Sequence, residues 1–136
     1  MEKKKEKILQ WHPAFFASLQ IELAEEAEFL KFESEHLLGS RPMQLDVLIV
    51  KKNRERKIQK NIGRNFRTHN IIEYKSPEDY LSIDDFYKVY GYTCFYKSDT
   101  RRINEIPAEE LTISIVCCHY PRELIKYLER KGRTVT

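Results

Sequence analysis

The alternation of apolar and polar positions divides the chain into stretches with the periodicity of a helix or of a strand. In chain order they are helix 13–30, strands 31–38, 43–51 and 69–75, helix 82–97, strand 111–118 and a last helix from residue 121. A Gly-Ser-Arg-Pro turn separates the first two strands, which should therefore form a hairpin. This order predicts an α/β fold, a mixed sheet with helices on its faces, and the strongly apolar strand 111–118 should be central.

The third predicted strand carries an acid and a base on one face. Side chains alternate along a strand, so Glu73 and Lys75 point the same way. In the second strand, Asp46 falls on the same face as Leu48, where a carboxylate is costly unless it is paired or bound to a cation. If the two strands are neighbours, Asp46, Glu73 and Lys75 meet. The alternative is that Asp46 is solvated near the start of its strand.

Such a set has the chemistry of a Mg²⁺ site. Hard divalent cations prefer carboxylate and carbonyl oxygens. Asp46 and Glu73 would hold the ion, and the backbone carbonyl of Tyr74 could add a ligand. Lys75 could orient or deprotonate a water, or offset charge on a phosphate.

Positive charge is concentrated directly before this strand. Residues 51–70 hold eight Lys or Arg and one Glu, a net +7, whereas the whole chain carries +3. Nucleic-acid affinity depends mainly on phosphate contacts, so the segment is a candidate DNA-binding surface. A solvated basic loop is the plainer alternative. The candidate contacts are Lys51, Lys52, Arg54, Arg56, Lys57, Lys60, Arg64 and Arg67.

Composition supports a single globular domain over residues 1–136, with a polar leader at 1–10. The chain is 41% hydrophobic, and its 33% of charged residues are mixed in sign. Three cysteines, two of them adjacent, suggest no disulfide framework, and no signal peptide or membrane span is evident. We therefore expect a cytoplasmic protein with no membrane partner. The chain has no Gly-rich phosphate loop, and we expect no small-molecule cofactor.

At these residues the chain resembles a known family. The stretches 42–49 and 70–77, extended by 84–92, are similar to the bacterial PD-(D/E)XK nuclease transposases, which include recombination-promoting nucleases. The superfamily core is αβββαβ, with Asp on the second strand and Glu-x-Lys on the third. The resemblance therefore implies a restriction-endonuclease-like core from Pro13 to His119, with an extra C-terminal helix.

The resemblance also implies a function. It implies Mg²⁺-dependent hydrolysis of DNA phosphodiesters, with Mn²⁺ as a substitute. It assigns metal binding to Asp46 and Glu73 and a catalytic role to Lys75. Many members add a Glu from the first helix, for which Glu22 is the best candidate. Leu45 departs from the pattern, since it replaces the Pro of the nominal Pro-Asp pair.

Three questions stay open at this point. A catalytically inactive DNA-binding or assembly module of the same fold is the main alternative, and a protein-interaction module with a surface salt pair is another. The resemblance implies that the chain is either a short member or a fragment lacking a C-terminal region. A homodimer is one possible assembly. Weaker sites receive no role here: Cys117-Cys118-His119 lacks triad geometry, and His12, His36 and His69 lack partners at metal-ligand spacing.

Overall fold

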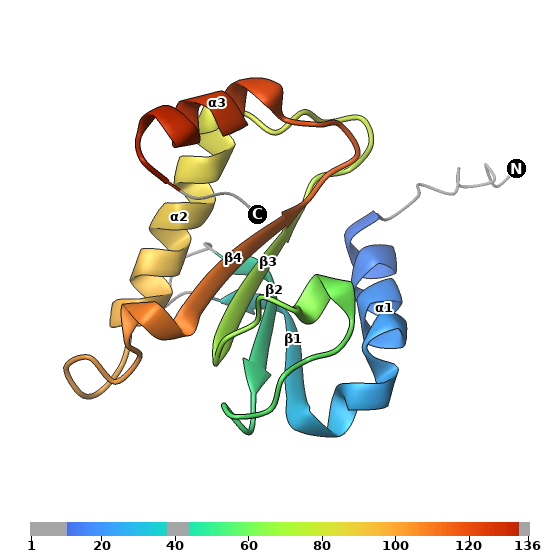
Figure 1. The fold of residues 1–136 in the computed structure, drawn as a ribbon, viewed down its shortest axis with the longest axis vertical. Coiled ribbons are helices and arrows are strands. Elements are labelled where there is room, and N and C mark those ends of the chain that lie inside the picture. Colours follow the sequence, from blue (N-terminus) through green and yellow to red (C-terminus); the bar gives the residue numbers. More distant parts are fainter. Residues whose placement is uncertain (1–10, 38–43, 134–136) are drawn as a thin grey trace, which may run out of the picture.

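The computed structural model describes residues 11–37 and 44–133 (Figure 1). The expected leader at 1–10 and the expected turn at 39–42 lie outside these ranges. The helices and strands are α1 (Trp11–Glu22), β1 (Leu30–Leu37), β2 (Gln44–Lys51), β3 (His69–Tyr74), α2 (Ile83–Ser98), β4 (Leu111–Val116) and α3 (Arg122–Arg130). Three short 3₁₀ helices, η1 (Ala24–Phe29), η2 (Asn61–Gly63) and η3 (Ala108–Glu110), lie between them. The predicted order of helices and strands is therefore confirmed.

The four strands form one mixed sheet in the order β1-β2-β3-β4. The pairs β1–β2 and β2–β3 are antiparallel, whereas β3 and β4 are parallel and are connected through α2. The expectation that the 111–118 strand is central is wrong, because β4 lies at the edge of the sheet and every one of its residues is half-buried. Leu111, Ile113 and Ile115 are covered by α2 and α3, and Val116 packs on the α1 face.

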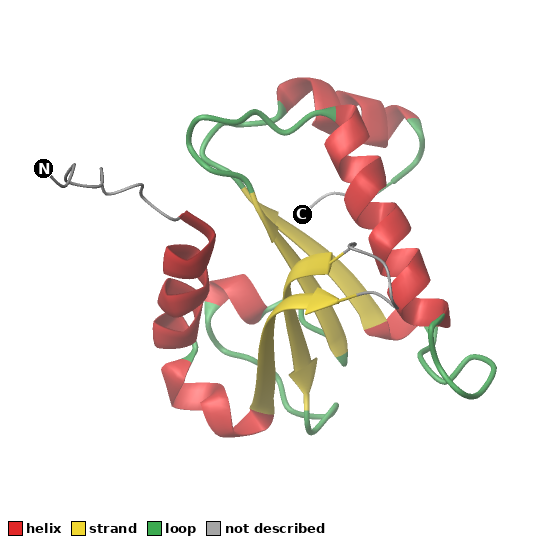
Figure 2. Cartoon of the chain, turned by 180° about the vertical axis from the view of Figure 1, so that it is seen from behind, coloured by secondary structure: helices red, strands yellow, loops and turns green. Residues whose placement is uncertain are grey.

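Helices cover both faces of the sheet, with α1 on one side and α2 and α3 on the other (Figures 1 and 2). The α1 face is built on Leu19, Leu23, Val47, Ile49 and Ile72, together with Ile58 and Phe66 from the segment between β2 and β3. The other face is built on Leu45, Leu48, Ile71 and Val89, and a third cluster joins Leu81 to Leu124 and Leu128 of α3.

The first helix is shorter than predicted. The α-helix ends at Glu22, and a 3₁₀ helix follows to Phe29. The cause is a distant contact: the side chain of Glu26 is buried and accepts a hydrogen bond from the backbone N–H of Gln59, at 3.0 and 3.3 Å to its two oxygens. Ala27, within the predicted helix, is exposed, and Leu30 belongs to β1.

The start of α2 is fixed by a capping box. The Ser82 hydroxyl accepts a hydrogen bond from the backbone N–H of Asp85 at 3.1 Å, and the Asp85 carboxylate accepts one from the backbone N–H of Ser82 at 3.0 Å. Both groups would otherwise be orphan donors of the first turn. The cap sets the position of Asp85, which matters for the site described below.

A buried asparagine joins the end of the basic segment to three strands. Asn70 has no exposed surface; its amide donates to the carbonyl oxygens of Ile49 (3.0 Å) and Arg67 (2.8 Å). Its Oδ1 accepts from the backbone N–H of Arg67 and from the Thr112 hydroxyl, both at 2.7 Å. All four hydrogen-bonding positions of this amide are therefore used, and the path of the chain into β3 is fixed.

Replacing Asn70 with alanine should destabilise the fold strongly. The change leaves buried backbone groups of Ile49 and Arg67 without partners, which costs about 2–4 kcal/mol in the free energy of unfolding. Urea denaturation of Asn70→Ala measures this. Asn61→Ala, at an exposed position of η2, is the matched control and should change stability by less than about 0.5 kcal/mol. Equal effects of the two variants would contradict the assignment.

Candidate active site

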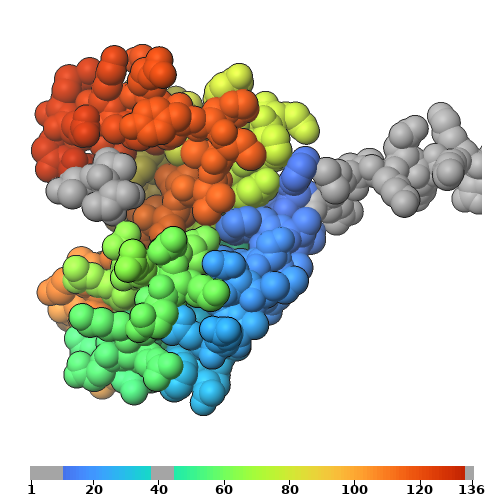
Figure 3. Space-filling model, turned by 45° about the vertical axis from the view of Figure 1, so that its right-hand side comes forward, coloured from blue at the N-terminus to red at the C-terminus, as the bar shows by residue number. Residues whose placement is uncertain are grey.

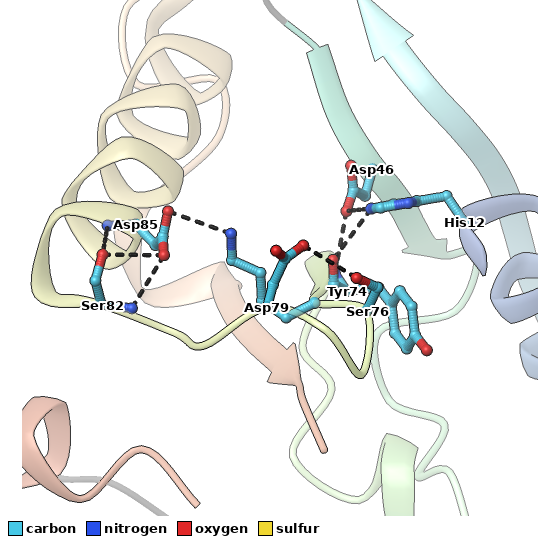
Figure 4. Close-up of polar contacts among 8 residues, drawn as sticks. His12, Asp46, Tyr74, Ser76, Asp79, Ser82 and Asp85 are labelled. Carbon is cyan, nitrogen blue, oxygen red and sulfur yellow. Dashed lines mark hydrogen bonds and ion pairs between the residues drawn. The ribbon is translucent and has the colours of Figure 1, made fainter. Parts of the chain in front are cut away.

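The antiparallel pair β2–β3 opens at the position of the predicted acids. Ladder pairing between the strands ends at Val47 and Ile72, although both strands continue beyond these residues. Instead of continuing the ladder, the backbone N–H of Tyr74 donates to Oδ2 of Asp46 at 3.1 Å (Figure 4). The carboxylate of Asp46 is thereby held against the backbone of β3, next to Glu73.

The first turn of α1 completes this arrangement. Nε2 of His12 lies 3.1 Å from the carbonyl oxygen of Tyr74 and 3.3 Å from Oδ2 of Asp46. Figure 4 shows the imidazole pointing from α1 at both oxygens. The rings of Phe15 and Tyr74 stack with centroids 4.6 Å apart, which positions α1 on β3. The helix therefore brings a nitrogen to two oxygens that sequence analysis proposes as metal ligands.

Glu73 is the most perturbed carboxyl of the site. Burial, and next the negative charge of Asp46, raise its pKa to about 7, although Lys75 and Lys88 act in the opposite direction. Two carboxyl groups that interact in this way cannot both ionise freely near neutral pH. A bound cation relieves both effects, so the pair has the electrostatics of a cation-binding site.

Lys75 follows Glu73 on the α2 side of the sheet. Its Nζ lies 3.3 Å from Oδ1 of Asp85, the residue that caps α2. Burial of Asp85 acts to raise its pKa, but hydrogen bonds from Ser82 and the Lys75 ammonium outweigh this and hold the pKa below its usual value. Asp85 is thus an ionised partner that keeps the ammonium beside Glu73.

The orientation of Asp46 differs from the prediction. Asp46 does not share a face with Leu48, because it lines a pocket of about 420 Å³ on the α1 side with His12, Phe15 and Val47. Leu45 packs with Leu48 instead. The alternation is interrupted opposite Glu35, which has φ of 54° and pairs with no residue of β2. A left-handed residue in a strand locally redirects the side chains around it.

The acid expected to join the site from the first helix lies far from His12. Glu22 is exposed at the last turn of α1, ten residues and about 15 Å of helix from His12. Within residues 11–37 and 44–133, no group of three or more His, Cys, Asp and Glu side chains is arranged to hold a metal ion. The donors that converge are a carboxylate and a backbone carbonyl, whose oxygens match a hard divalent cation in kind.

The basic segment leaves the sheet away from Asp46. Lys51 ends β2 five residues later, about 17 Å along the strand, and no residue of the segment lines the pocket beside Asp46. In Figure 3 the segment (green) packs below α1 (blue), whereas the residues that follow β3 (yellow-green) lie above it. Within the segment, Phe66 and Ile58 are buried.

Several cations of this segment make structural contacts. Arg54 pairs with Glu110 at 2.9 Å, Arg56 stacks over the ring of Phe29 at 3.8 Å, and Arg67 donates to the carbonyl oxygen of Glu109 at 2.8 Å. Lys51 is buried, and burial lowers the pKa of its ammonium despite the nearby Glu110. Four of the eight proposed DNA contacts therefore already have partners or are buried. The remaining four, Lys52, Lys57, Lys60 and Arg64, stay candidate phosphate contacts.

Sequence reasoning missed two residues of the site. His12 was given no role because its partners are 34 and 62 residues away, and no local spacing signals such a contact. Glu35 lines the same pocket as Asp46 and His12, but a Glu in an alternating polar strand gives no sign of a positive φ. The residues before α3 gave no site either: burial raises the pKa of the Cys117 thiol, and His119 is hydrogen bonded to the Pro77 carbonyl at 2.8 Å.

Fold and site together define a mixed α+β domain with a carboxylate–lysine cluster where two antiparallel strands separate. No protein-family model matches the chain, and searches of curated proteins and of solved structures find no match. In the part of the chain that the structure describes, no helix combines the length and apolar character needed to cross a membrane.

Proposed function

We propose that this protein is a divalent-metal-dependent DNA endonuclease with a PD-(D/E)XK-type site, and that it acts in recombination or transposition as its resemblance implies. The observation that carries the proposal is the position of Asp46 where β2 and β3 separate. Its side chain faces α1 but contacts the backbone directly after Glu73, while Glu73 and Lys75 lie toward α2. Burial and the negative charge of Asp46 raise the pKa of Glu73, and Lys75, directly after β3, adds an ammonium. The order α1-β1-β2-β3-α2-β4 is also the one that the resemblance implies.

Each residue has a distinct part in this proposal. The Asp46 and Glu73 carboxylates, with the Tyr74 carbonyl, would hold a Mg²⁺ or Mn²⁺ ion. Such an ion, when bound, lowers the pKa of a water and offsets the charge that develops on the phosphoryl group. Lys75 orients the water or the scissile phosphate, and its ammonium is held in place by Asp85 at 3.3 Å. Both backbone groups of Tyr74 have a part, because its carbonyl would bind the ion and its N–H orients Asp46.

The direct test is cleavage of supercoiled plasmid by the purified protein. We expect nicked circles with Mg²⁺ or Mn²⁺ and none with a chelator, because water activation at this site needs the cation. Agarose gel electrophoresis over time measures the rate. An equal rate in the presence of chelator would show a contaminant or a different chemistry and would contradict the proposal.

A second function, DNA binding without turnover, is favoured by the separation between the basic segment and Asp46. The exposed Lys52, Lys57 and Arg64 could hold a phosphate backbone without bringing it to the site. This module would bind DNA with an affinity that falls steeply with salt, bind no divalent cation, and leave the plasmid supercoiled. Fluorescence anisotropy with labelled duplex, together with the plasmid assay, separates the two functions.

A further inference from the structure

His12 occupies a position that the nuclease proposal alone does not explain. One atom, its Nε2, faces both an oxygen of the Asp46 carboxylate and the Tyr74 carbonyl oxygen, the two oxygens that converge in this site. The contact joins the first turn of α1 to two strands (Figure 4). An imidazole fixed only for packing has no need to meet both of these oxygens with the same nitrogen.

The separations of these atoms are those of neighbouring ligands of one ion. Octahedral coordination with bonds of about 2.1 Å places adjacent ligand atoms about 3.0 Å apart. Nε2 lies 3.1 Å from the carbonyl oxygen and 3.3 Å from the carboxylate oxygen. The carboxylate is held in this direction by the Tyr74 N–H at 3.1 Å, so at least one of the two oxygens is preorganised.

The imidazole is also accessible. The His12 side chain is 50% exposed and lines the 420 Å³ pocket with Asp46 and the exposed Glu35. A neutral imidazole has one nitrogen without a proton, and Nε2 can bind a cation when the ring proton is on Nδ1. The pocket supplies room for waters that complete a coordination shell.

We propose that His12 is a nitrogen ligand of the divalent cation of this site, in the place that sequence reasoning gave to an acid of the first helix. The inference rests on the proposed function, because it uses the same Asp46 and Tyr74 oxygens. An imidazole donor favours first-row transition ions, whereas Mg²⁺ prefers oxygen. The site should therefore bind Mn²⁺ in preference to Mg²⁺, and His12 is the source of that preference.

The test is metal binding rather than activity. Titration calorimetry of the full chain with Mn²⁺ and with Mg²⁺ compares wild type, His12→Ala and Asp46→Asn, with His119→Ala as a histidine control outside the pocket. We expect His12→Ala to weaken Mn²⁺ binding by at least about 10-fold and Mg²⁺ binding by less than about 3-fold. The variant loses the imidazole nitrogen that favours Mn²⁺ and keeps the oxygen ligands that Mg²⁺ prefers. His119→Ala should bind as wild type does.

Pulsed electron paramagnetic resonance of the Mn²⁺ complex gives an independent answer. Coupling to one ¹⁴N nucleus is expected, and it should disappear in His12→Ala. Unchanged or tighter Mn²⁺ binding by His12→Ala, without nitrogen coupling in wild type, would overturn the inference and show that the imidazole competes with the ion. Mn²⁺ binding that is absent in wild type, or undiminished in Asp46→Asn, would instead refute the metal site and the proposed function with it.

Discussion

Replacing Asp46 with asparagine is expected to abolish metal-dependent nicking of DNA. The amide keeps the shape of the side chain and can still lie beside the Tyr74 backbone, but it removes the charge that would hold a divalent cation. A metal ion contributes several kcal/mol of transition-state stabilisation, which corresponds to a loss of at least about 100-fold in rate. Initial rates of plasmid nicking at saturating Mn²⁺, with circular dichroism to verify folding, measure the effect.

The matched control for this loss is Glu22→Gln. Glu22 is an exposed acid of the same domain, and α1 places it at the opposite end from His12. Its rate should stay within about two-fold of wild type, since exposed substitutions away from a site rarely matter. A loss comparable to that of Asp46→Asn would mean that the first-helix acid reaches the site after all. An unchanged rate in Asp46→Asn would remove this residue from the mechanism.

Glu73→Gln is expected to stabilise the metal-free protein at alkaline pH. The pKa of Glu73 is raised from 4.5 to about 7 in the folded protein, chiefly by burial and by Asp46. The folded state therefore holds a proton that the unfolded chain has released. Stability from this carboxyl is fully present below pH 4.5 and is lost as the pH rises through 7.

The neutral glutamine does not incur that loss. At pH 8 in chelator the variant should gain about 2–3 kcal/mol in the free energy of unfolding relative to wild type, and at pH 4 the difference should be close to zero. Urea denaturation at the two pH values measures it. Glu78→Gln, at an exposed position five residues later, is the control and should show no pH-dependent gain. A gain of equal size at both pH values would show that packing, not ionisation, is responsible.

Local patterns were sufficient for most of the secondary structure. The strand at 69–75 and the helix at 82–97 depend on residues a few positions apart, and both were predicted. The end of α1 was not, because it depends on the buried contact between Glu26 and the Gln59 backbone, 33 residues away. The edge position of β4 was missed for a related reason: an apolar strand covered by helices reads like a central one.

The candidate site, too, could be predicted only in part from the sequence. Asp46, Glu73 and Lys75 follow from strand periodicity and from the resemblance, and the structure places them at the same end of β2 and β3. The orientation of Asp46 toward α1 does not follow, since it depends on the interruption opposite Glu35. His12 enters only when a helix is packed on the sheet, and no single-sequence pattern carries that information.

The cap of α2 has a further consequence for how the site responds to heat. Asp85 both closes the first turn of the helix and holds the Lys75 ammonium, so fraying of that turn releases the ammonium. Helix ends open at far lower free-energy cost than whole domains do. The position of the Lys75 ammonium therefore depends on the local opening equilibrium of one helical turn as well as on the stability of the whole domain.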